Sequence, residues 1–247
     1  MKISIITVVY NRAKTIKRAI TSLRNQSYQN IEHIIIDGES NDGTLEILRD
    51  NLSNKDILVS ESDDGIYDAI NKGLKLCTGE IIGLLHSDDF FPHNNVLLEV
   101  IEHFKEKNVD GIYGDAIYFK PDAKEKVRYY SSSRFTPARL NWGWMPAHTT
   151  LFLRKKIYLE YGNFKVDYKI AADFDFICRI FRDGHLQVRY IPKVLMHMQS
   201  GGLSNSSWRN TILLNLEVMR ACRENRIQTN WLKLSLRYLK KLTEFIN

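Results

Sequence analysis

Two adjacent carboxylates, Asp88 and Asp89, are the sharpest chemical feature of the sequence, and they follow the apolar run 81–85. Neighbouring carboxylates repel each other unless a cation or strong hydrogen-bond donors stabilise them. Carboxylate oxygens suit Mg²⁺ or Mn²⁺, ions that often bridge to substrate phosphates. The alternative is structural, because an Asp pair before Phe90-Phe91-Pro92 is also suited to cap the next helix. The spacing alone favours neither interpretation.

Polar residues also follow two other apolar runs. Tyr10-Asn11-Arg12 comes after 3–9, and Asp37-Gly38 comes after 31–36. Ligands of open α/β sheets bind beyond the carboxyl ends of the strands, so these residues and the Asp pair are expected at one rim. An Asp before Gly is, taken alone, more typical of a turn. No GxGxxG motif follows the first run, which disfavours a dinucleotide site, and Thr44 in place of a lysine excludes a standard NTPase phosphate loop.

The elements that would position these residues can be read from hydrophobic periodicity. In the first half, β-rich apolar runs alternate with helical patterns, which is typical of βαβ units around a mostly parallel sheet. The expected strands are 3–9, 31–36, 56–60 and 80–85, and the expected helices are 13–25, 43–51, 65–77 and 94–107. The second half is less regular. There we expect an antiparallel pair at 111–119 and 126–131, strands at 149–154 and 187–191, and helices at 172–183, 208–224 and 231–246.

Composition is ordinary for a globular protein. The chain has 247 residues, of which 44% are hydrophobic and 26% charged, and no apolar run approaches the ~20 residues that cross a bilayer. A strand pattern begins at residue 2, so we expect no cleavable signal peptide. Three cysteines without a CxxC pair suggest core thiols in a reducing cytosol. We therefore expect a cytoplasmic protein.

The positive charge is concentrated near the C-terminus. The formal net charge is +6, and residues 208–247 hold eight Lys/Arg against three Glu, which leaves about +1 for the rest. A near-neutral body argues against nucleic acid as a partner and points to a local partner for the tail. We expect one α/β domain at 1–207 followed by a basic helical extension at 208–247.

Four ordered segments carry a resemblance to a known family. They are 5–11 (IITVVYN), 35–44 (IIDGESNDGT), 63–73 (DDGIYDAINKG) and 85–89 (LHSDD). Together they resemble the inverting family 2 glycosyltransferases of the GT-A fold. The third is similar to the branch that builds bacterial capsular, colanic-acid-type and O-antigen polysaccharides. The match is close over 3–89 and looser to about residue 202, and it implies a nucleotide-sugar half at 1–107 and an acceptor half at 108–207.

The resemblance also implies roles for single residues. Tyr10, Asn11 and Asp37 match positions that hold the nucleotide base, and Asp64 and Asn71 match positions near the nucleotide and sugar. Asp88 and Asp89 match the DxD-type element, in which the first acid contacts ribose or sugar and the second binds Mn²⁺ or Mg²⁺. His86 departs from the Asn or Asp often found at its position.

The catalytic base of the family is an acid that opens a late helix, typically in a Glu-Asp pair. Here the matching segment is 171–179 (AADFDFICR), with Ala172 in place of the Glu. The resemblance implies Asp173 as the base that takes the proton of the acceptor hydroxyl. Asp175 is the weaker candidate, since residues i and i+2 of a helix point about 200° apart and only one can face the cleft. The structural alternative for Asp173 is a favourable acid at a helix N-terminus.

The segment 142–149 (WGWMPAHT) resembles the acceptor-side loop of this branch. Trp142 or Trp144 is suited to stack on a sugar ring, or else to anchor the loop in the core, and both interpretations stay open. His148 is a candidate neighbour of the donor phosphates or the acceptor. His197 and residues 201–204 are similar to a late loop that closes over the donor in related enzymes.

The last helix of the extension is amphipathic. On a helical wheel its apolar residues fill an arc of about 200°, with Lys233, Arg237, Lys240 and Lys241 opposite. This pattern is typical of an interfacial membrane anchor, and equally of a helix packed on its own domain or on a partner subunit. The apolar residues are Trp231, Leu232, Leu234, Leu236, Tyr238, Leu239, Leu242, Phe245 and Ile246.

The favoured function is a metal-dependent inverting transferase. It would move a sugar from a UDP, GDP or dTDP donor to a saccharide acceptor. This acceptor would be linked to a lipid at the inner face of the cytoplasmic membrane. One alternative is a sugar-nucleotide pyrophosphorylase, which needs a Gly-rich basic loop that Tyr10-Asn11-Arg12 does not provide. The other is a nucleotide-sugar-binding or carbohydrate-binding protein that has lost the base, which the missing Glu before Asp173 keeps open.

Overall fold

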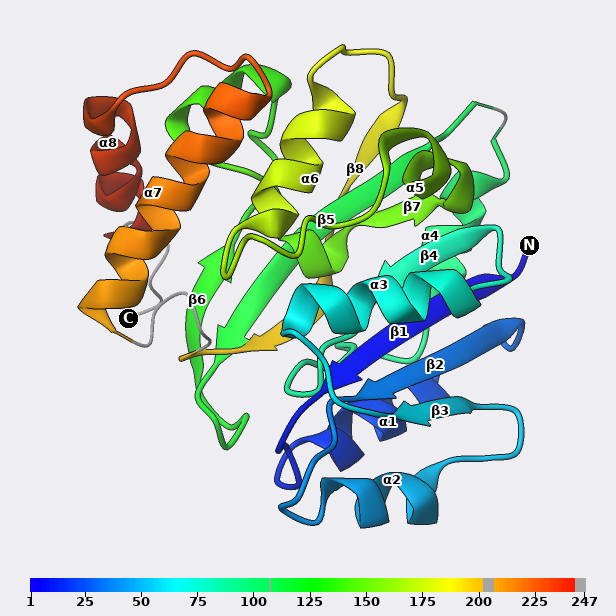
Figure 1. The fold of residues 1–247 in the computed structure, drawn as a ribbon. Helices are drawn as coiled ribbons and strands as arrows, with labels where there is room; N and C mark the ends of the chain where they lie inside the picture. The colour runs from blue at the N-terminus through cyan, green and yellow to red at the C-terminus, as the bar shows by residue number, and fades with distance from the viewer. Residues whose placement is uncertain (107, 202–206, 243–247) are drawn as a thin grey trace.

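The computed structural model describes residues 1–106, 108–201 and 207–242 (Figure 1). Its strands form one sheet in the order β3-β2-β1-β4-β7-β5-β6, with β8 paired to β5. Helices cover the sheet on both sides, so the fold class expected from the sequence is confirmed.

The first half is a parallel sheet built from buried apolar strands. β1 (Ile3–Val9) lies between β2 (Ile31–Asp37) and β4 (Ile81–Leu84), and β3 (Ile57–Ser60) pairs with β2; all three pairings are parallel. Every residue of β1 is buried, as expected for a strand covered on both faces. The carboxyl ends of these strands therefore meet at one rim.

Four helices connect or follow these strands. They are α1 (Ile16–Arg24), α2 (Thr44–Asn51), α3 (Ile66–Leu76) and α4 (Val96–Phe104). α3 packs against β1 and β2 on one face, and α1 and α2 lie together on the other (Figure 1).

The second half extends the sheet with antiparallel pairs. β7 (Phe152–Arg154) joins β4 to β5 (Gly111–Phe119), and β6 (Lys126–Tyr130) pairs with the far end of β5. β8 (Val188–Gln199) runs parallel to β5 along its whole length, with two shifts of register. The antiparallel pair expected from the sequence is present.

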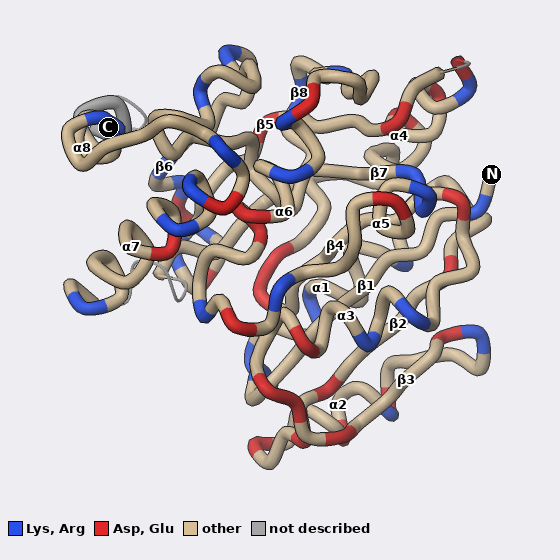
Figure 2. The backbone as a smooth tube through the Cα atoms, turned by 45° about the horizontal axis from the view of Figure 1, so that its top comes forward, with Lys and Arg blue, Asp and Glu red and all other residues tan. Residues whose placement is uncertain are grey.

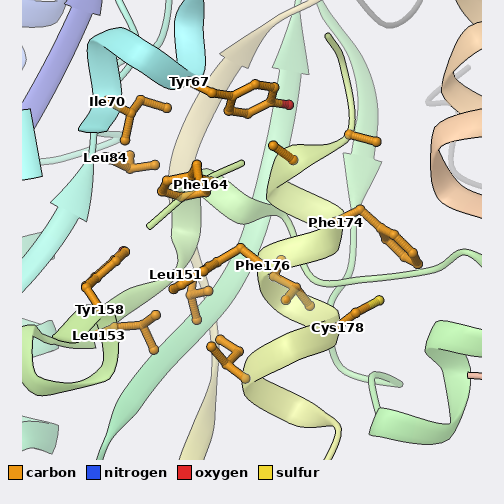
Figure 3. Packing of buried hydrophobic residues seen from close by; sticks show 14 of the residues in the cluster. Tyr67, Ile70, Leu84, Leu151, Leu153, Tyr158, Phe164, Phe174, Phe176 and Cys178 are labelled. Atoms are coloured by element: carbon orange, nitrogen blue, oxygen red, sulfur yellow. The ribbon is translucent and has the colours of Figure 1, made fainter. Parts of the chain in front are cut away.

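The remaining helices follow β7 in the chain. They are α5 (Lys155–Tyr161), α6 (Ala172–Phe181), α7 (Trp208–Glu224) and α8 (Trp231–Leu242), and the 3₁₀ turns η1 (Pro137–Trp142) and η2 (His148–Thr150) precede β7. α6 packs its aromatic residues into the largest buried cluster, where Tyr67 of α3 points toward the start of α6 (Figure 3). α7 lies along α6, and α8 contacts η1.

Three elements differ from the sequence expectation. The strand expected at 149–154 begins only at Phe152, because His148–Thr150 form the 3₁₀ turn η2. β8 continues to Gln199 rather than ending at Ile191, because Pro192 sits at a sheet edge, where a missing N–H breaks no ladder. α5 was not expected at all, since its seven residues are too short for a clear helical period. The expected helix end at Ile246 lies outside the described residues.

The three cysteines are free and buried, as expected for core thiols. Within the described ranges, no helix has the length and apolar character needed to cross a membrane.

Candidate active site

A pocket of about 1130 Å³ opens at the carboxyl rim of the parallel strands. Its walls come from the ends of β1 and β4, the start of α3, the loop 143–148, the start of α6, the end of β8, and both C-terminal helices. Of the residues with expected roles, Tyr10, Asn11, Asp88, Asp89, Trp144, His148 and Asp173 line it.

The loop after β1 contains Asn11, whose backbone has a left-handed conformation. Asn11 has φ 51°, and its Oδ1 accepts a hydrogen bond from the backbone N of Asn41 at 2.9 Å. The Asn11 backbone N donates in turn to Ser40 Oγ at 2.9 Å. These bonds join the loops after β1 and β2 and leave the ring of Tyr10 57% exposed at the pocket wall.

Asp37 lies at the end of β2, fully buried. Its Oδ2 accepts hydrogen bonds from the backbone N of Ser40 at 3.1 Å and from Ser60 Oγ at 2.7 Å, whereas Oδ1 has no partner among the described residues. A buried carboxylate oxygen without a donor is costly, so this atom suits an N–H from a ligand. Asp37 itself is not among the described lining residues, although its neighbour in register, Val9, is.

The segment after β3 contributes a different acid from the one expected. Asp63 lines the pocket, and Asp64, which is exposed, does not. Asp63 packs so tightly on Gly38 that a Cβ there would lie 2.5 Å from Asp63 Oδ2. Two adjacent acids look alike in sequence, so local pattern does not show which of them reaches the pocket wall.

Asn71 is also placed differently from the expectation. Its Nδ2 donates to the carbonyl O of Phe164 at 2.8 Å, and its Oδ1 accepts from the N of Phe164 at 3.0 Å. The amide is thus used to hold the loop before α6. The structure does not bring it to the described wall of the pocket.

Asp88 and Asp89 stand at the end of β4 as expected. Asp89 is 3% exposed; its Oδ1 accepts from the backbone N of Gln199 at 3.3 Å, and its buried Oδ2 has no partner in the described part of the chain. Burial and then the charge of Asp88 raise the pKa of Asp89 well above its usual range. An orphaned oxygen beside a second carboxylate fits a divalent cation, which would restore the ionised form.

The described residues contain no cluster of three or more His, Cys, Asp or Glu side chains that would hold a metal. The aspartate pair would therefore leave other ligand positions to phosphate oxygens and water, as Mg²⁺ commonly does.

Arg18 is a neighbour of this pair that the sequence did not reveal. Its Nη2 donates to the carbonyl O of Asp88 at 3.1 Å, and its guanidinium lies over the ring of Phe90 at 4.6 Å. Burial lowers the pKa of Arg18, an effect that the two aspartates oppose. Arg18 sits inside a regular helical pattern 70 residues from Asp88, so no local signal marks it.

Asp173 lies in the first turn of α6 and lines the pocket. Its Oδ2 is 3.2 Å from Nδ1 of His148, and its Oδ1 accepts hydrogen bonds from its neighbour Phe174 N at 2.8 Å and from the hydroxyl of Tyr67 at 3.3 Å. Burial raises the pKa of Asp173 to about 6. A carboxylate with a pKa near neutrality is suited to accept a proton from a hydroxyl.

Two histidines continue this set of contacts. Nε2 of His148 lies 3.2 Å from Nε2 of His86, which follows β4. Burial lowers the pKa of each imidazole to about 4, and in His86 the nearby His148 adds to the effect. Both rings line the pocket.

Asp175 points away from the pocket into a buried ion-pair network. It contacts Nε of Arg179 at 3.0 Å and Nζ of Lys165 at 3.1 Å, and it accepts from Nδ2 of Asn225 at 2.9 Å. As expected, only one of the two acids of α6 faces the pocket: Asp173 lies at the described pocket wall and Asp175 does not.

The two tryptophans of the acceptor-side loop are separated. Trp144 lines the pocket and stacks on Tyr130 with ring centres 6.3 Å apart. Trp142 is not among the described lining residues; its ring lies below Nζ of Lys233 at 5.8 Å. His197 is packed between the rings of Phe90 and Phe119 rather than at the wall. Residues 202–204 of the late loop lie outside the described residues.

The C-terminal helices complete the pocket. Thr211, Leu214 and Val218 of α7, with Arg237 and Tyr238 of α8, line its far end. Arg237, expected on the solvent face of its helix, instead donates through Nη1 to the carbonyl O of Gly143 at 3.0 Å. The boundary at residue 207 stays a prediction, but these helices are part of the site wall.

Comparison with known proteins places this geometry in a family. The model for "Glycosyl transferase family 2" matches residues 4–188. A PGL/p-HBAD biosynthesis glycosyltransferase of Mycobacterium bovis is 30% identical over 208 residues, covering 82% of this chain and 79% of the relative. Chondroitin synthase of Pasteurella multocida is 26% identical over 84% of this chain, but only 21% of that protein is covered.

Solved structures show the same fold. A mannosyltransferase from Pyrobaculum calidifontis in complex with GDP-Man and Mn²⁺ has a TM-score of 0.65 at 19% identity, over 89% of this chain and 64% of that one. Residues 1–349 of S. aureus TarS in complex with UDP have a TM-score of 0.61 at 19% identity, over 88% of this chain and 65% of that one. This chain spans 39% of the longer TarS chain. With the family model matched across both halves of the sheet, the chain belongs to glycosyl transferase family 2.

Proposed function

We propose that this chain is a metal-dependent inverting glycosyltransferase of bacterial surface polysaccharide biosynthesis. It moves a sugar from a nucleotide-diphosphate donor to a saccharide acceptor, carried on a lipid. The observation that carries the proposal is that one pocket holds both an aspartate pair, in which Oδ2 of Asp89 is buried without a partner among the described residues, and a separate aspartate of raised pKa, Asp173.

The donor lies across the rim of the parallel strands. The base binds beside Tyr10 and Asn11 at the pocket wall, and Asp37, buried behind this wall, keeps the role at the base that the resemblance implies. Asp89 would hold Mn²⁺ or Mg²⁺, which when bound neutralises the diphosphate and stabilises it as a leaving group, and Asp88 contacts the ribose or sugar of the donor. Mn²⁺ and GDP-Man in the mannosyltransferase, and UDP in TarS, support this use of the same fold.

Asp173 is the base. It takes the proton as the acceptor oxygen bonds to the anomeric carbon, and the electron pair of the broken bond leaves with the diphosphate. Attack on the face opposite the leaving group inverts the anomeric centre. The position of Asp173 in the pocket supports an enzyme rather than a binding protein that lacks a base.

The acceptor approaches from the side of Trp144 and the C-terminal helices. α7 and α8 expose apolar side chains, and Figure 2 marks Lys and Arg positions along the backbone of the same helices. This combination suits an anionic membrane surface. This placement supports a lipid-linked acceptor, which we propose lies at the inner face of the cytoplasmic membrane. The polysaccharide branch resembled by residues 63–73 supports the same acceptor class.

The donor site is tested by calorimetric titration of UDP, GDP and dTDP, each with and without Mn²⁺. Wild type should bind one nucleotide in a metal-dependent manner, and Asp89→Asn should lose that dependence. Asp122→Asn changes an exposed aspartate in the turn between β5 and β6 and serves as the matched control. Absence of binding by wild type to all three nucleotides would refute the proposal.

A further inference from the structure

The acceptor-side loop and the base are connected by direct contacts between side chains. His148, in the three-residue turn η2, contacts Asp173 of α6 through Nδ1 and His86 after β4 through Nε2, each at 3.2 Å. The three residues are 62 and 25 positions apart in sequence, and all line the pocket.

Geometry determines where the protons of this set lie. The two Nε2 atoms are within hydrogen-bond distance, so one of them donates and the other accepts. An ionised Asp173 can only accept, which places the proton of His148 on Nδ1 and leaves its Nε2 bare. His86 then donates through Nε2. Its Nδ1, which bears no proton in this arrangement, is the atom without a partner among the described residues.

The same contacts distinguish the two oxygens of Asp173. Oδ1 already accepts from Phe174 N and from the Tyr67 hydroxyl. Oδ2 faces Nδ1 of His148 at 3.2 Å and accepts no hydrogen bond from the other described residues, so a lone pair of Oδ2 stays available. Oδ2 is therefore the atom that can take a proton from a ligand.

We propose that His148 is a positioning residue, which holds Oδ2 of Asp173 toward the acceptor hydroxyl while His86 fixes the tautomer of His148. This inference rests on the proposed function, because it gives a role to a residue around the base of that reaction. It also explains His86, which departs from the family pattern: an imidazole N–H at this point fixes the tautomer of the neighbouring ring.

The test compares two substitutions of His148 with a matched control. His148→Ala removes the donor, whereas His148→Asn places an amide N–H at the position of Nδ1. The control is His33→Ala, because His33 is also buried and 3.6 Å from an aspartate, Asp56, but lies outside the described pocket wall. Turnover is measured as release of nucleoside diphosphate from UDP-GlcNAc and GDP-mannose with Mn²⁺, with water as the acceptor.

His148→Ala should lower kcat about 10- to 100-fold with little change in KM for the donor, as for loss of other groups that orient a reacting ligand. It should also move the acid limb of the pH profile to higher pH, because the ionised form of Asp173 loses a hydrogen-bond donor. His148→Asn should restore most of kcat and the original limb. His33→Ala should lower the melting temperature and leave the limb unchanged.

A second readout does not depend on turnover. ¹⁵N NMR of the histidine side chains should show His148 as the Nδ1–H tautomer and His86 as the Nε2–H tautomer. The reverse tautomer on His148, or an unchanged acid limb in His148→Ala, would overturn the inference while leaving the transferase intact. Wild type that neither binds a nucleotide nor turns over either donor would instead overturn the proposed function.

Discussion

At the scale of single residues, the site separates two carboxylates of one helix by their surroundings. Asp173 is buried beside neutral groups, which raises its pKa to about 6, whereas Asp175 is enclosed by Arg179 and Lys165. The first arrangement favours proton uptake, and the second holds Asp175 in ion pairs. Helical geometry alone directs one to the pocket and the other to the core.

Asp173→Asn should abolish most turnover and preserve donor binding. Loss of a general base costs about 10²- to 10⁴-fold in kcat, and the metal pair at Asp88 and Asp89 is untouched. Single-turnover release of nucleoside diphosphate, together with calorimetry of the nucleotide, measures both quantities. Unchanged turnover would show that another group is the base.

The raised pKa of Asp173 also predicts how stability depends on pH. The folded state holds this proton more tightly than the unfolded chain, where the ordinary pKa is 3.8. Its stabilising contribution is complete below pH 4 and is lost as pH rises through about 6, which amounts to about 3 kcal/mol. Asp173→Asn should therefore raise the melting temperature relative to wild type at pH 8 and not at pH 4. The opposite order would contradict the raised pKa.

Asp175→Asn should mainly affect folding. Removing this charge leaves Arg179 and Lys165 without their buried partner, which costs about 3 kcal/mol. Urea unfolding measures the loss, with Asp122→Asn as an exposed control. A variant as stable as wild type would show that the network contributes little.

At the scale of elements, α7 holds the start of the helix that carries the base. The carboxylate of Glu217 accepts the backbone N–H groups of Lys169, Ile170 and Ala171, at 2.8, 2.9 and 2.9 Å. These groups precede the first turn of α6, so the carboxylate fixes the approach to Asp173. A segment expected to be an appendage thus contacts the start of the helix that carries the proposed base.

Glu217→Ala should cost about 1–3 kcal/mol of stability, since three backbone N–H donors, one of them buried, lose their acceptor. It should also lower kcat, because the start of α6 is released. Glu46→Ala on α2 is the control, since Glu46 is exposed and lies away from the described pocket wall. Thermal unfolding and turnover of the same preparations measure both effects; a variant equal to the control in both would exclude the positioning role.

At the scale of the whole molecule, the apolar arc of α8 is divided between two environments. Leu234 is fully buried against the loop at Gly143, whereas Trp231, Leu232 and Leu236 are 52%, 69% and 40% exposed. An arc of about 200° is wider than one contact surface can cover, so the helix packs on its own domain and still exposes apolar residues. α7 exposes Trp208, Ile212 and Leu216 at four-residue spacing.

Vesicle binding tests this surface. Wild type should sediment with vesicles that contain phosphatidylglycerol more than with phosphatidylcholine alone, because the extension is basic. The double variant W231Q/L232Q should reduce binding about tenfold, in line with the loss of apolar area. The control L159Q alters an equally exposed leucine on α5, 77% exposed. Equal binding of the two variants would exclude α8 as the membrane contact.

The sequence by itself determined the parallel half of the sheet, the acids at its rim and the family, because these depend on local periodicity and on short ordered motifs. Only the tertiary structure decided that Asp63 rather than Asp64 faces inward. It also showed that Asn71 holds a loop and that Trp144, rather than Trp142, lines the pocket. The tertiary structure alone also revealed the contacts of Arg18 with Asp88, of His86 with His148 and of Glu217 with the segment before α6. Each of these contacts joins residues far apart in the chain, and local patterns carry no information about which distant elements pack together.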